Sequence, residues 1–396
     1  MRDTAKDAFK NLQIPAENSA LLCLDGGGIR GMMTIQLLKK LEEQAGAPCH
    51  QIFDMVAGTS TGGIIAGLVA AGHSAIEIER LYEAFVAKVF VKRGLFANQF
   101  VNPPAWSKAS YRQVLKSTIG DLTLAQACER SGLDLLITAH DVAEGEETYF
   151  SFVRGRRPPA KNVYGTVLLR AVMEATMSAP TYFNPLERFV DGGTTTFNNP
   201  ALPAILEAVQ YGSDAYAANR LTVMSFGTGC RTQSVAPGQL PNPPGLDTPF
   251  WLSWLMTEAG NDASDMQSDL LRATRLIDGF DYRRFQISLD KAALANLPNL
   301  GLEEVHVTDA QSLRELSDAE LASIHLDNVA YFPVMAAIGQ AFVEFIIDEA
   351  KRRQTVPFSF DLINAQGKEL LVTRSGDVPT IARQMSDPDW LDRQPA

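Results

Sequence analysis

A serine between two glycines is the first residue whose setting could do chemistry. The run Gly58-Thr59-Ser60-Thr61-Gly62 has the G-x-S-x-G spacing of a nucleophile elbow. It follows an apolar run at 53–57 (FDMVA) and precedes an Ala/Ile/Leu-rich stretch at 63–71, so it joins a predicted strand to a predicted helix. Such a turn strains the middle residue, lets no Cβ fit at either flank, and lifts the serine hydroxyl above the sheet edge. We therefore predict that Ser60 is a nucleophile for acyl transfer.

A glycine cluster precedes this turn, and we predict that it forms an oxyanion hole. Backbone N–H groups of Gly26, Gly27 and Gly28 can point at one spot, and a helix starting near Gly31 adds a favourable dipole. The strands before the two loops should be neighbours, so both loops should open on the same edge of the sheet. Arg30 has two interpretations, because it could brace the loop or bind a phosphate headgroup.

The same cluster also satisfies G-x-G-x-x-G, which would indicate a nucleotide-binding module. That fingerprint requires an acidic residue near the end of the following strand to hold a ribose. Here the nearby acid, Asp54, stands at the start of that strand, so the acceptor is missing, and the serine turn takes the place where the ribose would lie. The nucleotide interpretation is retained as a minor alternative.

A serine nucleophile needs a base, and the familiar base is histidine. The chain order Ser–Asp–His of α/β-hydrolases would require His306 or His325, and neither lies in an obvious loop after a sheet strand. A triad esterase that uses His306 or His325 is therefore the alternative hypothesis.

Asp191 is the stronger candidate for the base. It follows the apolar pair Phe189-Val190 and precedes Gly192 and Gly193, so backbone can approach its carboxylate closely. An ordinary carboxylate is a feeble base toward an alcohol. The mechanism would therefore depend on a dry site that raises its basicity and on donors that carry the developing charge.

These three motifs, in this order and spacing, resemble the patatin-like phospholipases. The resemblance covers roughly residues 18–290 and extends to further segments, namely 178–183 (SAPTYF), 198–200 (NNP), 225–229 (SFGTG) and, less closely, 282–286 (YRRFQ). It implies a three-layer α/β/α fold and a catalytic dyad of Ser60 and Asp191 beside an oxyanion hole at Gly26–Gly28. It also implies release of fatty acids from phospholipids or related acyl lipids, without a metal or other cofactor.

Short apolar runs alternate with helical periods, which predicts an α/β fold with a mostly parallel central sheet. The predicted strands are 20–24, 53–57, 133–139, 147–153, 221–226 and 284–289. The predicted helices are 32–44, 63–71, 168–178, 250–259, 265–276, 318–323 and 331–351, with a hairpin over 357–373.

We divide the chain into an N-terminal segment (1–17), a catalytic domain (18–300) and a C-terminal helical region with a hairpin (301–396). A proline-rich excursion at 234–249 interrupts the catalytic domain. The C-terminal region is either regulatory or part of the same domain. The apolar stretch 329–347 is interrupted by polar residues and fits a buried or amphipathic helix better than a membrane span.

The composition is that of a globular protein, with 46% hydrophobic and 20% charged residues. A net charge of -11 argues against nucleic acid as a partner. The four cysteines show no metal-ligand spacing and are expected to be reduced. Without an apolar segment at the N-terminus, we expect a cytoplasmic protein, although export without a signal peptide stays open.

The expected partners are phospholipids or other acyl lipids, with peripheral contact to a membrane, and the sequence is compatible with a protein or small-molecule activator. Two segments could touch the bilayer. The aromatic run 250–256 (FWLSWLM) is either a lid or a helix packed on the sheet. The basic run 154–161 (RGRRPPAK) either binds anionic headgroups or is a solvated loop.

Overall fold

A computed structural model of the chain describes residues 3–89, 107–158, 160–230, 248–273, 280–308, 311–322 and 328–373, together with Ile324, Arg383 and residues 385–393. Its centre is a seven-stranded sheet in the order β4-β3-β2-β1-β6-β7, with β5 also paired to β3. The strands are β1 Ser19–Leu24, β2 Met55–Thr59, β3 Asp134–Asp141, β4 Glu146–Phe152, β5 Phe189–Asp191, β6 Leu221–Phe226 and β7 Asp281–Phe285.

The middle of this sheet is parallel, as the sequence predicts. Strands β3, β2, β1, β6 and β7 run in one direction, while β4 and β5 pair with β3 in the opposite one. Because β1 and β2 are direct neighbours, the loops that follow them open on the same edge. The predicted adjacency of the two glycine-rich loops is confirmed.

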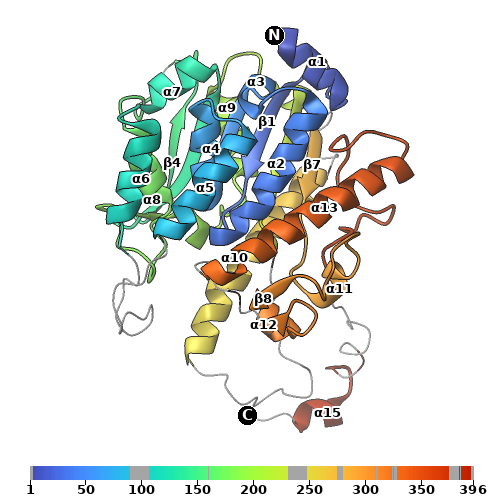
Figure 1. Cartoon of the computed structure of the whole chain (residues 1–396). Coiled ribbons are helices and arrows are strands. Elements are labelled where there is room, and N and C mark those ends of the chain that lie inside the picture. Colours follow the sequence, from blue (N-terminus) through green and yellow to red (C-terminus); the bar gives the residue numbers. More distant parts are fainter. Residues whose placement is uncertain are drawn as a thin grey trace.

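Helices cover both faces of the sheet, which gives three layers (Figure 1). On β1, Leu22 and Leu24 pack into a large core on one face, whereas Leu21 and Cys23 pack into a smaller core on the other. The larger core is covered by α1 Asp3–Asn11, α2 Gly31–Ala45, α3 Cys49–Ile52, α4 Thr61–Ala70, α5 Ala75–Val89, α6 Ala109–Ile119, α7 Leu124–Ser131, α8 Leu169–Thr176 and α13 Phe332–Arg352. The smaller one is covered by α9 Ala201–Tyr211 and α10 Thr248–Arg272.

Helix α13 lies across α2, although the two are about 300 residues apart in sequence (Figure 1). They cross closely at Gly339, where a Cβ would lie 2.8 Å from the Cα of Met33. By length and composition Val329–Arg352 could cross a membrane. Ile338 and Phe342 are nevertheless buried in the same core as α2, which confirms the prediction of a buried helix.

Several predicted elements differ from those observed. In place of the two predicted helices, 250–259 and 265–276, the structure has one helix, α10. The polar residues between the two predicted segments continue the helix without a break. Residues 357–373 reverse direction through one antiparallel bridge, Ile363 to Glu369, rather than through a hairpin of two strands. The smaller remaining elements are α11 Lys291–Leu294, β8 His306–Thr308, β9 Gln311–Ser312, α12 Asp318–Ala322 and α15 Pro388–Asp392.

The described part of the basic run is mostly exposed at Arg154, Arg157 and Lys161, which agrees with the interpretation as a solvated loop. Arg156 is paired with Glu207 inside the protein, and Arg154 donates to Asp134 at 2.8 Å. The aromatic run 250–256, interpreted as either a lid or a packed helix, forms part of α10, and most of the excursion at 234–249 lies outside the described residues. All four cysteines are free thiols, as predicted.

Candidate active site

Ser60 sits at the sharp turn between β2 and α4. Its backbone angles are φ 52° and ψ −122°, a left-handed conformation that a non-glycine residue adopts only under constraint. A Cβ on Gly58 would overlap the Gly62 carbonyl, and one on Gly62 would overlap the Leu24 carbonyl. The predicted need for glycine at both flanks is confirmed.

Sheet register places Asp191 beside this turn. Strand β3 pairs with β2 up to Thr138 opposite Thr59, and β5 takes over at the next position, with Ala139 opposite Asp191. Asp191 therefore lies where β2 would have continued, and Ser60 Oγ donates a hydrogen bond to Asp191 Oδ2 at 2.6 Å. The structure thus brings together two predicted residues that are 131 positions apart in the chain.

The Asp191 carboxylate is buried, with 3% of its surface exposed. Its second oxygen, Oδ1, accepts from the N–H of Gly193 at 2.7 Å. Burial raises the pKa of Asp191 to about 7, and the hydrogen bonds from Ser60 and Gly193 oppose that rise. No salt bridge to Asp191 is seen in the described part of the chain, so no cation stabilises its charge.

The glycine loop lies against the serine turn. A Cβ on Gly26 would lie 3.1 Å from the Cβ of Ser60, so only glycine permits this approach. The Gly26 N–H donates to the Asn198 carbonyl at 3.2 Å, which removes Gly26 from the predicted set of oxyanion donors. Within the described residues, no protein acceptor takes the N–H of Gly27 or Gly28. The predicted hole therefore narrows to these two groups.

Arg30 braces this loop. Its Nε donates to the Gly27 carbonyl at 3.2 Å and its Nη1 to the Gly229 carbonyl at 2.6 Å. The side chain is buried, so its geometry favours the bracing interpretation over headgroup binding.

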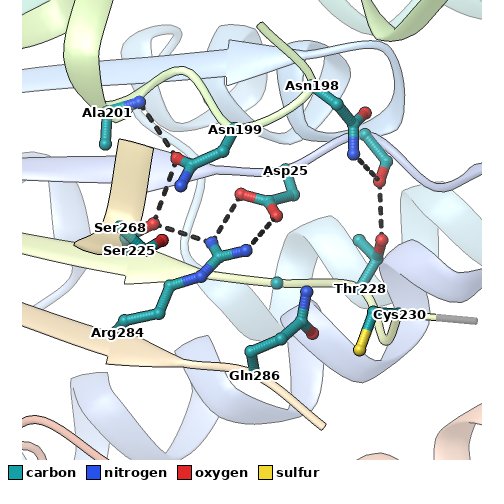
Figure 2. A network of polar contacts seen from close by, with 12 residues as sticks. Asp25, Asn198, Asn199, Ala201, Ser225, Thr228, Cys230, Ser268, Arg284 and Gln286 are labelled. Carbon is teal, nitrogen blue, oxygen red and sulfur yellow. Dashed lines mark hydrogen bonds and ion pairs between the residues drawn. The ribbon is translucent and has the colours of Figure 1, made fainter. Parts of the chain in front are cut away.

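A buried ion pair anchors the start of the loop (Figure 2). Arg284 on β7 donates to both carboxylate oxygens of Asp25, at 2.7 and 2.6 Å, and to Ser225 Oγ at 2.8 Å. On the other side, Thr228 Oγ1 donates to the Gly26 carbonyl at 2.6 Å. The start of the glycine loop is thus held by a side chain from β7 and by one from the loop after β6.

Comparison with known proteins identifies a domain in this chain. Residues 22–205 match the family described as Patatin-like phospholipase. This chain carries a patatin-like phospholipase domain. The match includes the glycine loop, the serine turn and Asp191.

Named relatives agree with this assignment. The chain is 32% identical over 230 residues to the 85/88 kDa calcium-independent phospholipase A2 of Rattus norvegicus, covering 53% of this chain and 27% of that protein. It is 30% identical over 237 residues to a cGAMP-activated phospholipase of Escherichia coli, covering 56% of this chain and 65% of that protein. The chain therefore spans only part of the length of each. The solved structure of VipD from Legionella pneumophila aligns with 80% of this chain and 67% of that one at 12% identity, with a TM-score of 0.37, too low to carry an argument.

The histidines of the alternative triad do not join the patatin-like site where they are described. His306 lies exposed on β8, in a separate two-stranded sheet. His325 lies outside the described residues. The Ser60 hydroxyl instead donates directly to Asp191.

The nucleotide interpretation also lacks its acidic acceptor in the patatin-like domain. Asp54 precedes β2, and its Oδ2 accepts from the N–H of Ala20 at 2.9 Å. Ala20 lies near the start of β1, so Asp54 stands at the edge of the sheet opposite the glycine loop.

Sequence reasoning missed several supports of the site. Thr176 Oγ1 accepts the N–H of Ser60 at 2.8 Å and so fixes the strained turn. Asn198, Thr228 and Arg284 lie in segments that carry the family resemblance, which was the available signal, but spacing alone gave them no role.

Proposed function

We propose that this chain is a serine lipid acyl hydrolase of the phospholipase A or lysophospholipase type. The observation that carries the proposal is the 2.6 Å hydrogen bond from Ser60 to a buried Asp191 that has no cationic partner among the described residues. This pair lies inside a patatin-like domain, and the relatives with that domain are named phospholipases.

Acylation begins when Asp191 takes the Ser60 proton and Oγ attacks the ester carbonyl of the lipid. The carbonyl oxygen becomes an oxyanion, which accepts hydrogen bonds from Gly27 and Gly28 N–H. When the C–O bond of the ester breaks, the proton on Asp191 passes to the departing alkoxide, which leaves as a lysolipid or alcohol. The acyl group stays on Ser60.

Deacylation repeats these steps with water. Asp191 takes a proton from water, and the oxygen of that water attacks the acyl-enzyme carbonyl. The C–Oγ bond breaks, Ser60 recovers the proton, and the fatty acid leaves. A carboxylate with a pKa of about 7 is a better base than an ordinary aspartate, because this pKa is closer to the working pH.

The remaining expectations concern the setting of the reaction. Because phospholipids reside in bilayers, we propose peripheral binding to a membrane from the cytoplasm, with the active edge of the sheet facing the lipid. One relative is named for activation by cGAMP, and we propose that a small molecule could likewise activate this chain. The rat relative is named calcium-independent, and we propose the same for this chain, with no metal or cofactor in the two half-reactions.

The test is fatty-acid release from phosphatidylcholine and phosphatidylglycerol vesicles. Ser60→Ala and Asp191→Ala should each lower the rate by at least about 10³-fold with the fold intact by circular dichroism. Ser19→Ala is a matched control. Ser19 begins β1, at the edge of the sheet far from the site, and its buried hydroxyl donates to the Ala215 carbonyl. Hydrolysis that survives either active-site change would overturn the dyad. A loss in His306→Ala or His325→Ala would support the triad, and saturable NAD binding lost in Gly28→Ala would support the nucleotide module.

A further inference from the structure

A buried tyrosine hydroxyl joins the glycine loop to the serine turn. Tyr82 lies on α5, a helix that no motif singles out, and 2% of it is exposed. Its hydroxyl lies 2.5 Å from the Gly28 carbonyl oxygen and 2.6 Å from Thr61 Oγ1. Thr61 directly follows the nucleophile, so one side chain contacts both loops of the site.

The direction of each hydrogen bond follows from chemistry. A carbonyl can only accept, so Tyr82 must donate its single proton to Gly28. Thr61 must therefore donate to the tyrosine oxygen. Burial raises the pKa of Tyr82 above its ordinary value, so the hydroxyl keeps this proton at working pH.

This bond completes a set of anchors along the loop. The Gly26 carbonyl accepts from Thr228, and the Gly27 carbonyl accepts from Arg30. In a planar trans peptide the N–H of the next residue points opposite to the carbonyl, so Thr228 orients the N–H of Gly27 and Arg30 orients the N–H of Gly28. Tyr82 holds the following peptide and so fixes the far side of Gly28. The Gly28 carbonyl also accepts the backbone N–H of Gly31, and Tyr82 adds the link from this carbonyl to the serine turn. Gly28 has a φ of 54°, and glycine moves from this conformation more easily than other residues.

We propose that Tyr82 is a positioning residue, whose hydroxyl keeps the Gly28 carbonyl directed into the protein and holds the oxyanion loop in register with Ser60. This inference rests on the proposed hydrolase function. It concerns the transition state more than the bound lipid, because movement of Gly28 would carry its N–H away from the developing oxyanion.

The ring of Tyr82 allows the hydroxyl to be tested alone. It stacks on Phe85 with centroids 6.1 Å apart and contacts Phe332 of α13 at 6.0 Å. Tyr82→Phe keeps these ring contacts and removes only the oxygen. Tyr216→Phe is the matched control, since that buried tyrosine donates to Asp134 at 2.7 Å at the opposite edge of the sheet.

The experiment compares wild type, Tyr82→Phe, Thr61→Val, the double variant and Tyr216→Phe. We expect kcat on phospholipid vesicles to fall about 10- to 100-fold in Tyr82→Phe with KM within about twofold, as for lost transition-state stabilisation. The rate at which a fluorophosphonate labels Ser60 should fall by a similar factor. The double variant should lose little more than Tyr82→Phe, because both changes break one chain of hydrogen bonds. Tyr216→Phe should retain the wild-type kcat even if its melting temperature falls as much as that of Tyr82→Phe.

The inference is wrong if Tyr82→Phe loses no more kcat than Tyr216→Phe, or if its loss appears in KM alone. Failure of the proposed function would look different. Wild type would then release no more fatty acid than Ser60→Ala and would not be labelled at Ser60, and the role of Tyr82 would fall with it.

Discussion

Two aspartates are buried beside glycine-rich loops on the same edge of the sheet, and their surroundings are opposite. Asp25 is 1% exposed and receives two hydrogen bonds from the guanidinium of Arg284. Asp191 is 3% exposed and receives hydrogen bonds only from neutral donors, Ser60 and Gly193, among the described residues. Asp25 has a full countercharge within 3 Å, and Asp191 has none in the part of the chain that the structure describes.

This difference separates a structural carboxylate from a reactive one. Burial raises the pKa of Asp25, and the guanidinium of Arg284 opposes that rise because it stabilises the anion. Burial also raises the pKa of Asp191, to about 7, and there only the hydrogen bonds from Ser60 and Gly193 oppose the rise. The buried Arg284 thus pairs with Asp25 at the start of the glycine loop, whereas Asp191, the partner of Ser60, stays basic.

Removing the cation from Asp25 should give the largest effect on stability. Arg284→Met leaves Asp25 buried without a countercharge, so we expect unfolding free energy to fall by about 3–5 kcal/mol. Urea denaturation measures this loss. Adding Asp25→Asn to Arg284→Met should recover part of it, and equal stability of Arg284→Met and wild type would contradict a structural role for the pair.

Removing the charge from Asp191 should have a smaller effect of opposite sign. The folded pKa of about 7 lies above the unfolded value of about 3.9, so the folded state binds more protons between these values and wild-type stability falls as pH rises through them. Asp191→Asn has no such slope. The unfolding free energy of Asp191→Asn should equal that of wild type near pH 4 and exceed it by at most about 4 kcal/mol above pH 8. Urea denaturation across this pH range tests it, and a variant less stable than wild type at pH 8 would refute the uncompensated charge.

The local half of the site could be predicted from sequence. Gly58, Ser60 and Gly62 lie in one short segment of the chain, and steric rules for a strand–turn–helix junction apply to them directly. The sequence indicates Asp191 by its two following glycines, by elimination of the histidines and by family resemblance. Its position depends on β5, a strand of three residues, which is too short for a hydrophobic period to reveal.

The supporting half could not be predicted, because it depends on sheet order and helix packing. Asp25 and Arg284 are 259 residues apart, and they meet only because β6 lies between β1 and β7. Tyr82 reaches Gly28 through the packing of α5 on α2, which no local pattern encodes. The same reason applies to α13. Its sequence predicts a buried or amphipathic helix but does not indicate that it packs on α2.

The basicity of Asp191 is the central claim, and a direct titration of its carboxyl group tests it. Carboxyl carbon NMR of protein labelled with ¹³C-aspartate, compared between wild type and Asp191→Asn, identifies the resonance of this residue. We predict a midpoint at about pH 7, because the group is buried without a cation. A midpoint at or below about pH 4, the range of an ordinary aspartate, would contradict the account.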